Sequence, residues 1–164
     1  MDFAVGDGVM YPSRGAGKIT GVEQLELVEG YEDYYVIDIP SGRLTVRIPT
    51  SRATDLGLRP VMSQASLDQV LKTLGSKPSN LADDYKVRQQ KVEEDLKTGR
   101  PLLLAQVIRD LTNRLQQTYL TKKDGDLLSH ARDLLADEMA MATDGDVTEI
   151  YDAMDAALGI QVAD

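Results

Sequence analysis

The residues that could carry catalysis or bind a metal are few and scattered. The chain has one histidine, His130, and no cysteine. The lack of cysteine excludes disulfides, cysteine-based zinc sites and thiol nucleophiles. His130 has no serine or aspartate at a spacing that indicates a catalytic triad. We therefore expect His130 to lie on the surface of a helix.

Two further patterns approach known sites without matching them. The segment Asp144-Gly145-Asp146 hints at a calcium loop, but an EF-hand loop starting there would need glycine at Glu149 and glutamate at Asp155. The glycines at positions 6, 8, 15, 17 and 21 fit neither the dinucleotide-binding fingerprint nor the P-loop. The sequence therefore predicts no catalytic residue, no metal and no cofactor. Carboxylates that converge in a cleft could be recognised only from coordinates.

Charge is distributed unevenly along the chain, whose net charge is −9. Residues 77–123 carry ten Lys/Arg against six Asp/Glu, whereas residues 124–164 carry one Arg against eleven acids. Nucleic-acid binding depends on local positive charge, so the first segment can meet DNA although the whole chain is acidic. Solvated helix faces would give the same charge pattern.

The chain has no run of about 18 apolar residues, so no membrane-spanning helix is expected. Residues 1–7 are acidic and rich in turn formers, which is unlike a signal peptide. Together with the absence of cysteine, these features predict a cytoplasmic protein.

Residues 1–60 have the pattern of short β-strands. Apolar residues alternate with polar or small ones through Val5, Val9 and Tyr11, and again over 18–27. Residues 34–39 are rich in aromatic and β-branched types, and 44–48 complete a hairpin after a tight connection at 40–42. Turns are expected at 13–17 and 29–32. This spacing predicts a small curled sheet or barrel.

The pattern changes to helix after Pro60. Ser66 is expected to cap a first helix that ends at Gly75. Asn80 is expected to cap a second helix, which would carry Asp83 and Asp84 in its first turn and run to position 99.

Three more helices follow. Pro101 suits the first turn of a third helix, whose apolar stripe runs from position 104 to Leu115. Thr121 begins a fourth helix, and Asp146 with Glu149 indicates a capping box for a fifth. The sequence thus predicts an α+β protein with a β domain over 1–60 and a bundle of about five helices over 61–164.

Several short motifs, in order along nearly the whole chain, resemble the CarD family. Residues 3–17, Phe-Ala-Val-Gly-Asp-Gly-Val-Met-Tyr-Pro-Ser-Arg-Gly-Ala-Gly, are similar to that family's opening F-x-V-G-D-x-V-V-Y-P-x-H-G-x-G. Further similar blocks lie at 44–49, 57–59, 80–86, 107–111 and 131–138.

The resemblance implies a fold and a function. It implies that the β domain is a Tudor-like barrel, shared with the polymerase-binding module of transcription-repair coupling factors. That barrel would dock on the β subunit of bacterial RNA polymerase, partly by adding a strand edge to a sheet there. The helical domain would face promoter DNA at the upstream edge of the transcription bubble and stabilise the open complex. The protein would be a non-enzymatic monomer, near the nucleoid through polymerase, with no membrane or small-molecule partner.

The resemblance also implies site residues. Arg47 should project to the face of its strand opposite Val46 and Ile48, where it can bind a partner carboxylate. The predicted polymerase-binding residues are Leu25, Thr45, Val46, Arg47, Ile48 and Pro49. The predicted DNA-binding residues are Asn80, Leu81, Lys86, Arg88, Lys91, Lys122 and Lys123.

The sequence departs from the family at the predicted DNA contact. Leu81 stands where the family has a tryptophan wedge, and Asp83 and Asp84 stand where relatives often have basic residues. Leu81 can act as a smaller apolar wedge between base steps, or as a core contact at the start of a helix. The acidic residues also leave a second hypothesis open, namely a protein-only adaptor that binds polymerase by strand addition and recruits another protein through its helical half.

Overall fold

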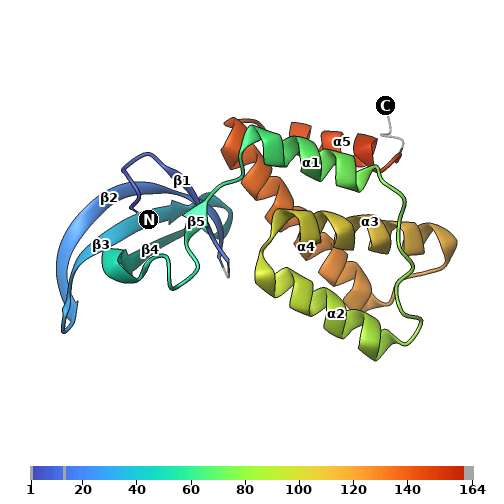
Figure 1. The fold of residues 1–164 in the computed structure, drawn as a ribbon, viewed down its shortest axis with the longest axis horizontal. Coiled ribbons are helices and arrows are strands. Elements are labelled where there is room, and N and C mark those ends of the chain that lie inside the picture. The colour runs from blue at the N-terminus through green and yellow to red at the C-terminus, as the bar shows by residue number, and fades with distance from the viewer. Residues whose placement is uncertain (1, 13, 161–164) are drawn as a thin grey trace. The chain divides into compact units, whose positions relative to one another are not determined.

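The fold was analysed in a computed structural model that describes residues 2–12 and 14–160. Its chain divides into two compact units, Met1–Val61 and Met62–Asp164 (Figure 1). The first unit holds the β-strands and the second holds the α-helices. Each unit has an apolar core of its own.

The first unit is a five-stranded antiparallel sheet that curls around its core (Figure 1). The order of its strands across the sheet is β4-β3-β2-β1-β5. The strands and the two short 3₁₀ turns are β1 (Gly8–Tyr11), β2 (Gly15–Val28), β3 (Tyr31–Ile39), η1 (Pro40–Gly42), β4 (Leu44–Pro49), η2 (Thr50–Arg52) and β5 (Arg59–Pro60).

Apolar side chains from the strands and from the segments next to them fill the core of this unit. They are Phe3, Val9, Ile19, Tyr35, Ile37, Ile39, Ile48, Ala53 and Leu58. Gly17 is required where β2 crosses β3, because a Cβ there would lie 2.7 Å from the backbone oxygen of Asp38. The alternating pattern also includes Val22 and Leu27, yet both are exposed, because β1 pairs with β2 only over 15–18.

Two expected turns are shorter than predicted. The turn expected at 13–17 is shorter because β2 already begins at Gly15. Ser13 lies outside the described residues. The turn at 29–32 contracts to Glu29-Gly30, because Gly30 adopts a φ of 89° and lets β3 start at Tyr31.

In the described part of the second unit, residues 62–160, five helices share one apolar core through their inward faces. They are α1 (Gln64–Leu74), α2 (Tyr85–Thr98), α3 (Pro101–Gln117), α4 (Lys122–Thr143) and α5 (Val147–Ala157). This arrangement confirms the predicted α+β class, with a Tudor-like β domain followed by helices. Leu115 does not belong to the stripe assigned to α3, because its side chain is exposed near the end of that helix.

The starts of α1 and α2 were predicted wrongly. α1 begins one turn earlier than expected because the Ser63 hydroxyl accepts a hydrogen bond from the backbone N–H of Ser66. α2 begins at Tyr85 because Asp84, and not Asn80, caps it: its carboxylate accepts from the N–H groups of Lys86 and Val87.

The other helix boundaries follow the sequence signals. Gly99 ends α2 in the left-handed conformation, with a φ of 63°, and Pro101 opens α3. Thr121 and Asp124 form a reciprocal capping box at the start of α4. Asp146 caps α5 by accepting from the N–H of Thr148.

Candidate functional site

Strand β4 forms one margin of the sheet. Among the described residues it pairs with β3 alone, in a register that sets Ile48 opposite Tyr35 and Val46 opposite Ile37. The backbone groups that point away from β3 therefore face outward, where another strand can pair with them.

Side chains on β4 alternate between the core and the outer face. Ile48 is 2% exposed and packs in the core, with Val46 half-buried beside it. Thr45 and Arg47 are exposed, so Arg47 does project to the face opposite Val46 and Ile48. The Ile48 side chain is enclosed in the core, so its predicted contact with a partner could involve its backbone only. Pro49 is half-buried at the end of the strand and has no N–H to offer.

Arg47 already has an intramolecular partner that sequence reasoning missed. Its Nε donates to the Glu23 Oε2 on β2 at 3.1 Å, across the intervening strand β3. The two side chains are 43% and 44% exposed, so the pair is solvent-screened and weak. Only the sheet register, which places Glu23 opposite Tyr34 and Arg47 opposite Val36, reveals this proximity.

Leu25 lies further along β2, where the ladder with β3 becomes irregular. The register shifts between Gln24 and Val28. Leu25 is half-buried and lines an open cleft of about 800 Å³ beside Glu26 and Tyr31. Leu25 and Glu23 lie on the same strand, two residues apart.

The predicted DNA contacts Asn80 and Leu81 lie in an irregular loop, residues 79–84, which connects toward α2. Asn80 is exposed, and Leu81 is half-buried against the helical core. The loop begins with the backbone N–H of Ser79, which donates to the Asp110 Oδ1 on α3 at 2.9 Å. Part of the Leu81 side chain thus packs inward, as expected for a core contact, and part remains at the surface.

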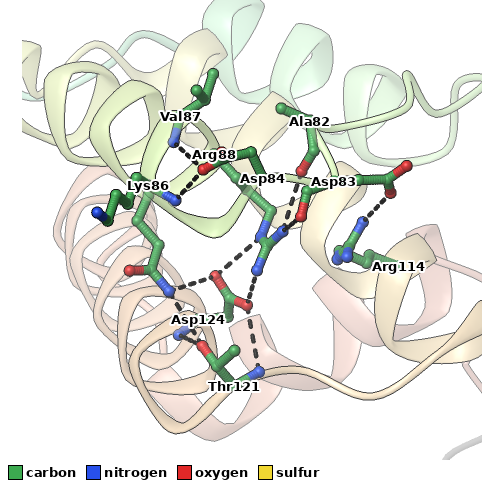
Figure 2. Close-up of polar contacts among 10 residues, drawn as sticks. Ala82, Asp83, Asp84, Lys86, Val87, Arg88, Arg114, Thr121 and Asp124 are labelled. Carbon is green, nitrogen blue, oxygen red and sulfur yellow. Dashed lines mark hydrogen bonds and ion pairs between the residues drawn. The ribbon is translucent and has the colours of Figure 1, made fainter.

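Arg88 is not a surface cation, and its prediction as a phosphate contact is wrong. Its side chain is 3% exposed and pairs with Asp124, which is 1% exposed. The Nε donates to Oδ1 at 3.1 Å and the Nη2 to Oδ2 at 2.8 Å, a two-point contact between guanidinium and carboxylate. Figure 2 shows Nη1 turned the other way, toward the carbonyl oxygens of Ala82 and Asp83, each 3.0 Å away.

Asp124 accepts hydrogen bonds from two further residues. The Gln89 amide donates to its Oδ1 at 3.2 Å, and the Thr121 backbone N–H donates to its Oδ2 at 3.2 Å. Burial by itself raises the pKa of this carboxyl group. The hydrogen bonds from Arg88, Gln89 and Thr121 outweigh that effect and hold the pKa below its ordinary value of 3.8.

This lowered pKa predicts an acid-dependent loss of stability. The folded state favours the charged carboxylate, so Asp124 stabilises the helical unit fully above the unfolded-state pKa of about 3.9. Its contribution disappears as the pH falls through the lower, folded-state pKa. Urea midpoints between about pH 6 and pH 2 should fall less steeply in Asp124→Asn than in the unsubstituted protein. An unchanged slope would contradict the assigned role, and Asp126→Asn, at an exposed position of the same helix, is the control.

The predicted lysine contacts all lie at the surface, mostly within ion pairs. Lys91 pairs with Asp95 at 3.1 Å, Lys122 with Asp126 at 3.2 Å and Lys123 with Glu93 at 2.8 Å. Lys86 lies 6.0 Å from the centre of the exposed Tyr85 ring. Such exposed pairs exchange partners easily, so these lysines remain available to phosphates, in contrast to Arg88.

Asp83 and Asp84 differ in their surroundings. The Asp83 carboxylate is fully exposed and accepts a 3.4 Å hydrogen bond from Arg114 on α3 (Figure 2). The Asp84 carboxylate is engaged with the first backbone N–H groups of α2. The negative charge of Asp84 is thus partly offset by the helix terminus, and that of Asp83 by a single arginine.

The part of the chain that the structure describes offers little for a catalytic or metal site or for a membrane-spanning helix. His130 is exposed on α4, and within 2–12 and 14–160 no group of three or more metal-binding side chains comes together. None of the described helices is both long enough and apolar enough to cross a membrane.

Comparison with known proteins identifies both units. The profile of the CarD-like/TRCF RID domain matches residues 3–62, and that of the CarD C-terminal domain matches residues 69–155, more than half of the chain. The chain belongs to the CarD family. A related protein, "Putative transcription factor YdeB" from Bacillus subtilis (strain 168), is 31% identical over 137 residues, which span 84% of this chain and 90% of the relative.

Membership of the CarD family gives the two units their type. The sheet is a domain of the RNA polymerase-interacting type, and the helical unit is the CarD C-terminal domain. CarD-family domains regulate transcription and are not known enzymes. Two surfaces of this CarD-family chain are therefore the candidates for such contacts, namely the β4 margin with Arg47 and the loop 79–84 with its neighbouring lysines.

Proposed function

We propose that this chain binds the β subunit of RNA polymerase through residues 1–60 and stabilises the open promoter complex through residues 61–164. The observation that supports this most directly is the outer margin of β4, which has a partner on one side only and presents Arg47 beside it. A strand of the polymerase would pair with this margin and extend the sheet. Membership of a family with a polymerase-interacting domain makes that strand the favoured occupant.

The outer face of β4 would supply specificity to this contact. Main-chain hydrogen bonds supply affinity in strand addition, whereas side chains select the partner. Thr45 and Arg47 project to that face, so a carboxylate of the polymerase would bind Arg47 in competition with Glu23. Ile48 contributes by anchoring the strand in the core, and Leu25 contributes an apolar contact further along the sheet.

The helical unit would reach DNA through the loop 79–84 and the exposed lysines. Leu81 would lie against base steps in the minor groove, with Asn80 beside it. Lys86, Lys91, Lys122 and Lys123 would approach phosphates. A few phosphate contacts give weak and salt-sensitive affinity. Tethering by polymerase raises the effective concentration of the helical unit at the promoter and compensates for this weakness.

The open-complex lifetime tests this function. With purified polymerase and promoter DNA, the protein should prolong the lifetime, and Leu81→Ala should shorten it by about tenfold, the effect of losing one apolar wedge contact of 1–2 kcal/mol. Leu102→Ala makes the same change at an exposed leucine near the start of α3. It should leave the lifetime unchanged. Equal lifetimes for Leu81→Ala and the unsubstituted protein would remove Leu81 from the DNA contact.

The adaptor function remains a second candidate because Asp83 is fully exposed at the loop. Two carboxylates beside phosphates would repel DNA, and they would instead suit a basic protein partner. A promoter footprint of polymerase with and without the protein separates the candidates. Added protection upstream of the bubble supports the DNA contact, whereas an unchanged footprint, with polymerase still bound to the protein, supports the adaptor.

A further inference from the structure

We propose that Arg88 is the positioning residue of the loop 79–84, and that its bond to Asp124 fixes the place from which Leu81 meets DNA. The role of Leu81 in DNA binding rests on the proposed function. The fixing of the loop by Arg88 does not depend on DNA.

Arg88 joins the loop to the body of the bundle. On one side its Nη1 donates to the carbonyl oxygens of Ala82 and Asp83, the two residues that follow Leu81. On the other side its Nε and Nη2 hold the Asp124 carboxylate at the start of α4. Figure 2 shows the guanidinium lying between these two groups. A planar guanidinium can serve both sides at once, because its N–H groups radiate in fixed directions.

The other end of the loop is held in a similar way. The Asp110 carboxylate on α3 accepts from the Ser79 backbone N–H at 2.9 Å and from the Arg109 Nε at 2.8 Å. Both side chains are about nine-tenths buried. The segment that contains Asn80 and Leu81 is therefore fixed by one arginine–aspartate pair before it and another after it.

Apolar packing holds this loop on one side only, where Leu81 lies against the helical core. Two cavities of about 200 and 230 Å³ adjoin Ser79, Asn80 and Leu81. A side chain beside a cavity lacks the dense contacts that normally fix a core residue. Hydrogen bonds to Arg88 and Asp110 therefore supply restraints on the loop that this packing does not.

A spin label can measure this restraint directly. The chain has no cysteine, so Ala82→Cys introduces one labelling site at an exposed loop position. Arg88→Met keeps the length of the side chain but removes its donors, and the nitroxide should then tumble about threefold faster or more, as expected for a loop that leaves a rigid state. Arg88→Lys should also free the loop, because an ammonium lacks the fork that reaches both sides. It keeps the charge beside Asp124 and provides a second variant if Arg88→Met fails to fold.

The control variant breaks a comparable ion pair elsewhere. Arg132 on α4 pairs with Asp155 on α5 at 2.8 Å, with both side chains about a quarter exposed or less. Arg132→Met should leave label mobility at position 82 unchanged. Unchanged mobility in both Arg88 variants would overturn the inference, whatever the protein does at a promoter.

A double-mutant cycle on the open-complex lifetime links the restraint to function. Arg88→Met alone should shorten the lifetime about as much as Leu81→Ala, and the two changes together should do no more than either one. Arg132→Met and Leu81→Ala should instead have independent effects. Independent effects of Arg88→Met and Leu81→Ala would overturn the functional part. If Leu81→Ala alone has no effect while the label is released, the proposed DNA contact fails and the positioning of the loop by Arg88 stands.

Discussion

Asp124→Ala is expected to lower the free energy of unfolding of the helical unit by about 3–5 kcal/mol, the usual cost of removing one member of a buried ion pair. The substitution leaves the Arg88 guanidinium in the interior without its carboxylate. It also removes the acceptor for the Thr121 backbone N–H and so opens the capping box of α4. Urea denaturation followed by circular dichroism at the helical band measures the loss.

Matched variants separate the ion pair from the helix cap. Asp126→Ala removes an exposed aspartate two positions further on that pairs with Lys122, and it should change the free energy of unfolding by less than about 0.5 kcal/mol. Asp124→Asn keeps an acceptor for Thr121 but loses the charge. Its loss in free energy of unfolding should therefore lie between those of Asp124→Ala and Asp126→Ala. A loss below about 1 kcal/mol for Asp124→Ala would mean that Arg88 finds water or another acceptor.

Replacing both members of the pair gives the complementary result. Arg88→Met with Asp124→Leu removes the two charges together and fills the site with apolar groups. The double variant should regain most of the free energy of unfolding that Asp124→Ala loses, because the ion pair contributes little beyond compensating its own desolvation. Loop mobility should not recover, because the carbonyl groups of Ala82 and Asp83 still lack their donor.

Arg47→Glu is expected to weaken binding to polymerase by about 30-fold or more, since reversal of a charge that becomes paired in an interface costs at least about 2 kcal/mol. Two effects act in the same direction. The new carboxylate repels the carboxylate that we propose on the polymerase, and it also lies beside Glu23, which loses its partner. The dissociation constant of the protein for purified polymerase, determined without DNA, measures the effect.

A charge swap distinguishes a lost contact from a damaged sheet. Glu23→Arg with Arg47→Glu rebuilds the ion pair across β3 in the opposite sense, so the fold and its thermal stability should match those of the unsubstituted protein. Binding should remain weak, because the outer face of β4 still carries a carboxylate. Lys72→Glu, at an exposed position of α1, controls for the change in net charge and should bind normally. Full binding by Arg47→Glu would show that polymerase occupies another surface.

The sequence alone was sufficient for the fold class and for most boundaries, because these depend on neighbouring residues. Alternation of apolar residues indicates strands, and the signals at Gly99, Pro101 and Thr121 act within one helical turn, so each could be recognised locally. The predicted change from strands to helices after Pro60 also follows from composition along the chain. Arg47 was placed on the correct face of β4 for the same reason, since alternation along a strand is a local property.

Tertiary structure alone decided which charged residues are free to act. Arg88 has the same helical surroundings in the sequence as Lys86 and Lys91, yet Arg88 is buried because Asp124, 36 positions away, reaches it through the packing of α4 on α2. Glu23 pairs weakly with Arg47 across a strand that separates them in space and in sequence. Arg88 and Asp110 also hold the loop before α2 by its backbone, through contacts with residues distant in the sequence. Such contacts depend on the three-dimensional register of distant elements, which no local pattern contains.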